Sequence, residues 1–137
     1  MVGFSVYFYF YQVGGADFLH SFFSTVAYRL ENGKWGQCYP YIMNQLYQGE
    51  LHVEDISYAM SELQDIKNRF TELTPDKVIW DIDDLSQKPP WEDNISTQIT
   101  NLSNYFVTSD GEDFITLFEH ALQKAKELNQ PMKIVSL

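Results

Sequence analysis

Two aspartates, Asp81 and Asp83, follow a short hydrophobic run, Val78 to Trp80, in this 137-residue chain. Carboxylates at the end of a buried strand can hold Mg²⁺, and one of them can attack phosphorus as a nucleophile. The same two side chains can also belong to a solvated acidic surface. The residues around them and elsewhere in the chain decide which interpretation is favoured.

The Asp81-Ile82-Asp83 order resembles the Asp-x-Asp opening of haloacid-dehalogenase-type phosphatases. Leu85 stands where those enzymes carry a threonine, and only about fifty residues follow the motif, too few for the rest of that fold. The later carboxylates, at positions 110–113, are better explained by the start of a helix. A small carboxylate- or metal-dependent hydrolase is therefore kept as an alternative function.

The other residue types that support catalysis or metal binding lack the required spacing. His20, His52 and His120 are far apart in the sequence and form no metal-ligand motif. No Gly-x-Ser-x-Gly elbow is present, and Cys38, as the only cysteine, excludes an intrachain disulfide and a cysteine-based zinc site. We expect no catalytic, cofactor-binding or metal-binding residues, and hence a protein that is not an enzyme.

Charged residues are distributed unevenly along the sequence. Between Asp81 and Asp113 there are eight acidic residues and one basic residue, Lys88, so this segment carries −7 of the total −10. Binding to nucleic acid or to an anionic membrane requires clustered Lys and Arg, which this chain lacks. An acidic surface instead favours a basic partner, whose approach it steers over long range.

An aromatic side chain lies inside this acidic segment. Trp91 follows Pro89-Pro90, which hold the backbone partly extended, and tryptophan in a loop is typical of protein–protein interfaces. The alternative is that Trp91 packs its own loop against a helix. The predicted partner-binding surface combines the carboxylates with this one indole: Asp81, Asp83, Asp84, Trp91, Glu92, Asp93, Asp110 and Asp113.

The elements that must position this surface can be predicted from periodicity. Residues 4–11 alternate between two faces and indicate a strand. Apolar residues at helical spacing predict helices that begin at Asp17 and near Val53. The Ser109 and Glu112 spacing fits a capping box at the start of a third. The complete prediction is strands over 4–11, 78–82, 105–108 and 132–137, helices over 17–30, 53–73 and 109–128, and helical turns over 42–47 and 95–102.

These elements predict a single domain over residues 1–137, because the sequence contains no repeat, linker or low-complexity run. The fold class is α+β, a two-layer sandwich with a mixed or antiparallel sheet of about four strands and three main helices. A three-layer α/β arrangement, which would bury the tyrosine face of the first strand, is the alternative. The N-terminus lacks the positive region of a signal peptide, and no segment is long and apolar enough to span a bilayer, so we expect a cytoplasmic protein.

Several strings of residues carry a resemblance to a known family. They are Pro-Pro-Trp-Glu-Asp-Asn-Ile-Ser over 89–96, Asn-Tyr-Phe-Val-Thr-Ser-Asp-Gly over 104–111, the strand over 4–10 and the helix start over 18–23. Together they resemble the bacterial immunity proteins of polymorphic toxin systems, in particular the immunity protein 70 family. The resemblance covers most of the chain.

The resemblance implies a protein that binds a cognate toxin domain and blocks it without catalysis and without a cofactor. It provides no catalytic residues to carry over. Many toxins of such systems are nucleases with a basic substrate groove, so a basic nuclease domain is the expected partner, and it matches the acidic charge. A regulatory interaction module whose partner is not a toxin remains the other alternative.

Overall fold

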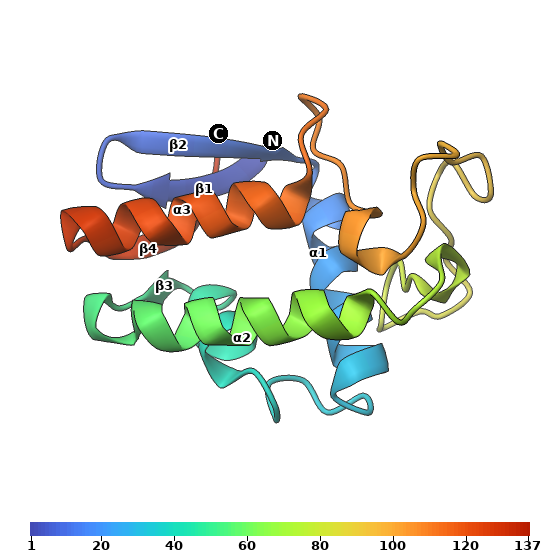
Figure 1. Cartoon of the computed structure of the whole chain (residues 1–137), viewed down its shortest axis with the longest axis horizontal. Coiled ribbons are helices and arrows are strands. Elements are labelled where there is room, and N and C mark those ends of the chain that lie inside the picture. Colours follow the sequence, from blue (N-terminus) through green and yellow to red (C-terminus); the bar gives the residue numbers. More distant parts are fainter.

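The computed structural model describes residues 1–137. A four-stranded antiparallel sheet forms one side of the protein. The strands lie in the order β2-β1-β4-β3, and the two chain ends meet at the sheet, where Leu137 N donates to Met1 O at 2.9 Å (Figure 1). Their bounds are β1 Val2–Val6, β2 Tyr9–Gly14, β3 Glu50–Leu51 and β4 Met132–Ser136. The predicted α+β class with an antiparallel sheet of about four strands is confirmed.

Three main helices pack on one face of this sheet, as predicted. Helix α3 (Phe114–Leu128) lies against the strands, α2 (Ile56–Phe70) runs beside α3, and α1 (Ala16–Thr25) crosses one end of both (Figure 1). The π-helical turn Val26–Leu30 continues α1. Shorter turns are the π-helical Tyr41–Leu46 and the 3-10 helices Val53–Asp55, Pro75–Lys77 and Leu102–Asn104. No helix is both long and apolar enough to cross a membrane.

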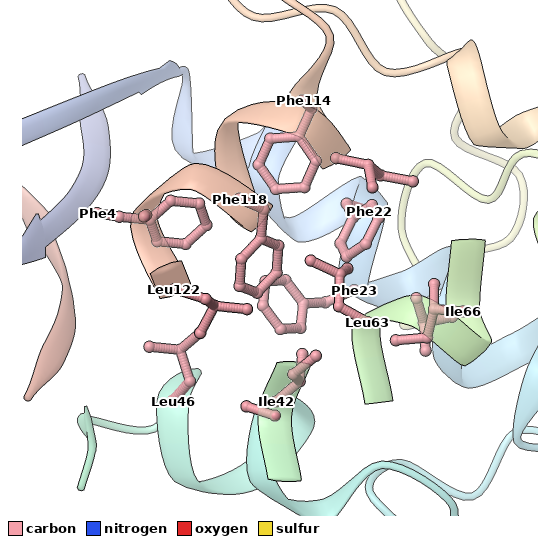
Figure 2. Packing of buried hydrophobic residues seen from close by; sticks show 14 of the residues in the cluster. Phe4, Phe22, Phe23, Ile42, Leu46, Leu63, Ile66, Phe114, Phe118 and Leu122 are labelled. Atoms are coloured by element: carbon pink, nitrogen blue, oxygen red, sulfur yellow. The ribbon is translucent and has the colours of Figure 1, made fainter. Parts of the chain in front are cut away.

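Aromatic rings fill the space between sheet and helices. Phe4 of β1 lies 4.6 Å, centroid to centroid, from Phe118 of α3, and Phe22 of α1 lies 4.7 Å from Phe114 (Figure 2). Each of these rings is fully buried, which contributes about 1.5–3 kcal/mol per side chain. Figure 2 also shows Leu63 and other aliphatic side chains closing the same core from the α2 side.

The other face of the sheet has no helical cover. In the antiparallel register Ile134 lies opposite Phe4, so its neighbour Lys133 points to the outer face. Lys133 is exposed and forms an ion pair with Glu50 of the adjacent strand at 3.6 Å. The alternative of a three-layer fold is therefore wrong.

The prediction of one strand over residues 4–11 is also wrong, because the chain reverses at Tyr7 and Phe8. The two halves pair as a β1–β2 hairpin in which Val6 lies opposite Tyr9. The reversal uses a left-handed tyrosine, Tyr7 with φ 53°, instead of the Gly or Asn that normally marks such a turn. As a result Phe8 is 86% exposed instead of buried on the core face.

Five further predictions differ from the structure, four of them between α2 and α3 and one at the start of α1. Residues 78–82 form no strand, the predicted helical turns over 95–102 are irregular, and the 105–108 strand reduces to one bridge between Val107 and Asp113. The cap of α3 is Asp113, not Ser109, and that of α1 is Gly15, not Asp17. The short apolar runs in this region pack against the hydrophobic core, and none of them pairs with a neighbouring strand to extend the sheet.

Candidate functional site

The acidic segment begins at residues 79–82, which are held by side chains of α1 instead of by a neighbouring strand. The hydroxyl of Thr25 accepts the Ile79 N–H at 3.0 Å, and the hydroxyl of Ser21 donates to the Ile79 carbonyl at 2.8 Å. Ser24 Oγ accepts the Ile82 N–H at 3.2 Å. These hydroxyls satisfy backbone groups that a β-ladder would otherwise satisfy, so the segment is fixed without being a strand.

This attachment brings Asp81 and Asp83 close to His20 of α1. His20 Nε2 lies 3.4 Å from Asp81 Oδ1, and ligand-type atoms of His20, Asp81 and Asp83 lie within 4.8 Å of one another. Tyr47 Oη lies 2.8 Å from His20 Nδ1. Burial, and to a smaller extent the Asp83 carboxylate, raises the pKa of the Tyr47 hydroxyl, which therefore keeps its proton at neutral pH.

Asp84 organises the next turn of the acidic segment. Its carboxylate accepts hydrogen bonds from the backbone N–H of Ser86 at 3.1 Å and from the Ser86 hydroxyl at 2.6 Å. The Ser86 hydroxyl, followed by the Gln87 amide, lowers the pKa of the Asp84 carboxyl because these donors stabilise its charged form. Asp84 is exposed and carries a full negative charge at neutral pH.

Glu92 and Asp93 lie on the wall of an open cleft of about 740 Å³. The same cleft is also lined by Pro75, Asp76 and Arg29, whose Nε donates to the Lys77 carbonyl at 2.9 Å. Both carboxylates are exposed, and neither forms an ion pair within 4 Å. Their charge is therefore available to another molecule.

Trp91 is half-buried and holds the loop in place. Its indole N–H donates to the Tyr105 hydroxyl at 2.7 Å, and its ring meets Trp80 edge-on at 5.5 Å. Burial raises the pKa of Tyr105, whose neutral hydroxyl accepts this bond. The alternative from the sequence is that Trp91 packs its loop against a helix; its partners Trp80 and Tyr105 instead lie outside the three main helices, and part of its ring remains at the surface.

Asp110 and Asp113 lie on a different projection. The turn before α3 rises separately from the loop that carries residues 83–93, which lies beside α1 and beyond the end of α2 (Figure 1). Asp113 caps α3 by accepting the Thr116 N–H at 3.0 Å, and the exposed Asp110 is 3.4 Å from the amide nitrogen of Gln12. The eight predicted residues thus form a main group over 81–93 and a separate pair.

Sequence reasoning missed His20 as a neighbour of the acidic segment. It lies between buried Leu19 and Ser21 on α1, and the pattern favoured a packed histidine. The available signal was a polar stripe on α1, since Ser21, Ser24 and Thr25 interrupt an otherwise apolar face and are all fully buried. Buried hydroxyls require partners, so this stripe marks where a non-helical segment attaches.

The geometry does not support the phosphatase alternative. The sheet is antiparallel, and Asp81 follows an irregular segment held by hydroxyls, so there is no strand end to present a nucleophile as in that fold. The fold and the site instead define an α+β domain with an acidic surface carried on irregular backbone.

The chain belongs to the immunity protein 70 family, whose model matches residues 4–134. No curated protein and no solved structure matches it. The resemblance drawn from the residue strings is confirmed, and family membership makes this an immunity protein of a toxin system. Such a protein acts on a cognate toxin.

Proposed function

We propose that this protein neutralises a basic toxin domain, with a nuclease as the expected toxin, by binding it without catalysis. The observation that carries the proposal is the charge of residues 81–93, where five acidic residues accompany a single basic one. The proposed contact residues are those of this group, with the separate pair at its periphery: Asp81, Asp83, Asp84, Trp91, Glu92 and Asp93, then Asp110 and Asp113.

Exposure of the carboxylates supports this role. Asp83, Asp84, Glu92 and Asp93 are all exposed, and the acidic segment has only Lys88 to offset them. Clustered charge of one sign raises association rates from about 10⁵–10⁶ to as much as about 10⁸–10⁹ M⁻¹s⁻¹ for an oppositely charged partner at low salt. Rapid capture suits a protein that must bind its toxin before the toxin reaches its target.

The fixed backbone of the surface supports tight binding as well. The hydroxyls of α1 hold residues 79–82, and Trp91 ties the following loop to Tyr105. A surface that is already ordered loses less conformational entropy when it binds. Trp91 therefore acts mainly by presenting Glu92 and Asp93, and the exposed part of its ring adds apolar contact at the edge of the interface.

A nuclease is the expected toxin because its substrate is a polyanion. A nuclease binds phosphates with clustered Lys and Arg, and an acidic surface seated on those side chains competes with nucleic acid. The same surface has no comparable reason to recognise a toxin whose active face is neutral or acidic. The charge thus supports both the class of partner and the mode of inhibition.

The test is capture followed by an inhibition assay. The protein is used as bait in a lysate of its native host, washed at low and then high salt, and the retained protein is identified by mass spectrometry. Its terminal domain is then produced and assayed on DNA and RNA with increasing bait. We expect a basic domain whose nuclease activity disappears near one equivalent; a retained toxin that is acidic, or whose activity is unchanged by excess bait, would contradict the proposal.

A further inference from the structure

His20, Asp81 and Asp83 form a cluster in which two of the proposed contact carboxylates meet a histidine that the toxin-binding role does not use. The imidazole comes from α1 and the two carboxylates from the segment that α1 holds, and one ligand-type atom of each lies within 4.8 Å of the others. Side chains from two separate parts of the chain thus converge on one point. Imidazole with carboxylates is a ligand set that suits Zn²⁺ and related divalent metals.

The imidazole is oriented in the way that metal-binding histidines are. Its Nδ1 lies 2.8 Å from the Tyr47 hydroxyl, while Trp35 stacks on the ring at 6.1 Å and 24°. Nδ1 can donate its proton to Tyr47 Oη, which leaves the Nε2 lone pair directed at the carboxylates. An outer partner on the far ring nitrogen is the usual companion of a histidine ligand.

The separation of two of the potential ligand atoms is compatible with a shared ion. His20 Nε2 and Asp81 Oδ1 are 3.4 Å apart, longer than the N–H···O distance of about 2.7–3.2 Å in a hydrogen bond, and Nε2 has no hydrogen-bond partner. Two ligands that each lie about 2.0–2.2 Å from a tetrahedral Zn²⁺ are about 3.3–3.6 Å from each other. The observed distance fits two ligands of one ion.

The charges around the cluster are unbalanced. Asp81 has no ion-pair partner except His20, and Asp83 has none, whereas Glu119 pairs with Lys67 and Glu50 pairs with Lys133. The side chains of His20 and Asp81 are only 26% and 34% exposed, so water screens them partially. A divalent cation would offset the repulsion between the two carboxylates.

We propose that His20, Asp81 and Asp83 bind one divalent metal ion of the zinc type, with water completing the coordination. Tyr47 is a positioning residue, because it contacts the imidazole and not the ion. The bound ion would fasten residues 81–83 to α1 and so stabilise the start of the acidic segment. This inference does not rest on the proposed function, and its test uses the isolated protein.

The experiment is calorimetric titration of the untagged, chelator-treated protein with Zn²⁺, paired with thermal melting. We expect one ion per chain and a rise in Tm of roughly 5–10 °C at about a hundred times Kd. Asp83→Asn should weaken binding about a hundredfold or more, and Tyr47→Phe, which removes an outer partner, by about 10–100-fold with unchanged stoichiometry. Asp83 is exposed, and it donates through its backbone N–H to Asp81 Oδ1 at 2.9 Å, a bond that Asp83→Asn retains, so this variant should fold normally.

A matched control distinguishes this cluster from the second group of potential ligands, His52, Glu54 and Asp55. Those residues belong to one turn, in which His52 and Glu54 are exposed and Asp55 is partly buried. His52→Gln should leave Zn²⁺ affinity unchanged, while His20→Asn should abolish binding. The absence of both binding heat and a Tm shift at millimolar Zn²⁺ would overturn the proposal. Loss of binding in His52→Gln, or full retention of binding in Asp83→Asn, would also overturn it.

Discussion

Two irregular segments of this protein, residues 31–41 and residues 81–93, use the same chemical group in opposite ways. In the first, Glu31 is 1% exposed and its carboxylate accepts the backbone N–H groups of Gly36, Cys38 and Tyr39 at 3.0, 2.9 and 3.0 Å. In the second, Asp83, Glu92 and Asp93 are exposed and their carboxylates accept no such bonds, although Asp84 still accepts the N–H of Ser86. Glu31 therefore holds its loop together, whereas these three carboxylates remain free on the surface of theirs.

Glu62 shows the same structural use near residue 41. It accepts the N–H groups of Tyr41 and Ile42 at 3.2 and 2.8 Å, at the start of the π-helical turn Tyr41–Leu46. Burial raises the pKa of the Glu62 carboxyl, and the two backbone donors partly oppose that rise. Structural carboxylates thus differ from those available to a partner in their hydrogen-bond partners and their burial, more than in residue type or net charge.

The largest expected effect comes from neutralising Glu31. Glu31→Gln replaces one acceptor oxygen with a donor that faces backbone N–H groups, and it removes the charge from all three bonds. We expect the free energy of unfolding to fall by about 2–4 kcal/mol. Urea denaturation measures this change. Glu92→Gln is the matched variant in the other segment and should stay within about 0.5 kcal/mol of wild type; equal losses would remove the distinction.

A smaller effect is expected where α1 holds residues 79–82. Thr25→Val keeps the shape of the side chain but leaves the Ile79 N–H without its acceptor, so we expect a loss of about 1–2 kcal/mol. Hydrogen exchange should show faster exchange at Ile79 than in wild type. Thr71→Val, which removes a hydroxyl that bonds only within its own exposed turn, is the control. Unchanged protection of Ile79 would show that the hydroxyls do not fix the acidic segment.

The smallest effect concerns the charge state of Asp84. The pKa of Asp84 lies below its ordinary value because of Ser86 and Gln87, so its contribution to stability is present at neutral pH and is lost as pH falls through the folded-state pKa. Ser86→Ala should raise the Asp84 pKa toward the ordinary value, as followed by NMR titration of the carboxyl group. Ser96→Ala, which lies outside this turn, should leave the Asp84 pKa unchanged. If the Asp84 pKa stayed low in Ser86→Ala, the shift would have another cause.

The regular part of the fold could be predicted because its helices and the last strand bury one face each. Ile56, Leu63 and Phe70 repeat at helical spacing and are all buried in α2. The β1–β2 hairpin could not be predicted, since Tyr7 and Phe8 continue the strand composition through the turn. Local periodicity carries no information about a reversal that uses no Gly, Asn or Pro.

The charge of the candidate site could be predicted from the sequence, but its geometry could not. Counting residues located the acidic segment, because charge is a property of composition. The proximity of His20 to Asp81 depends on hydroxyls of α1 that bind a backbone far away in the sequence, and no spacing rule describes such a contact. The separation of Asp110 from Glu92 likewise follows from loop paths that have no periodic pattern.

The central claim is that residues 81–93 form the surface that receives the toxin. The most direct test is the association rate of the captured toxin domain with the triple variant Asp83→Lys, Glu92→Lys, Asp93→Lys, measured over a range of salt with a chelator present. The control reverses three exposed glutamates elsewhere, Glu54, Glu72 and Glu127, and changes the net charge equally.

We predict that the triple variant associates at least about tenfold more slowly at low ionic strength, with a flattened salt dependence, while the control keeps most of the wild-type rate. An equal response of both variants would mean that only the overall charge matters. An unchanged rate and salt slope in the triple variant would contradict the assignment of this surface.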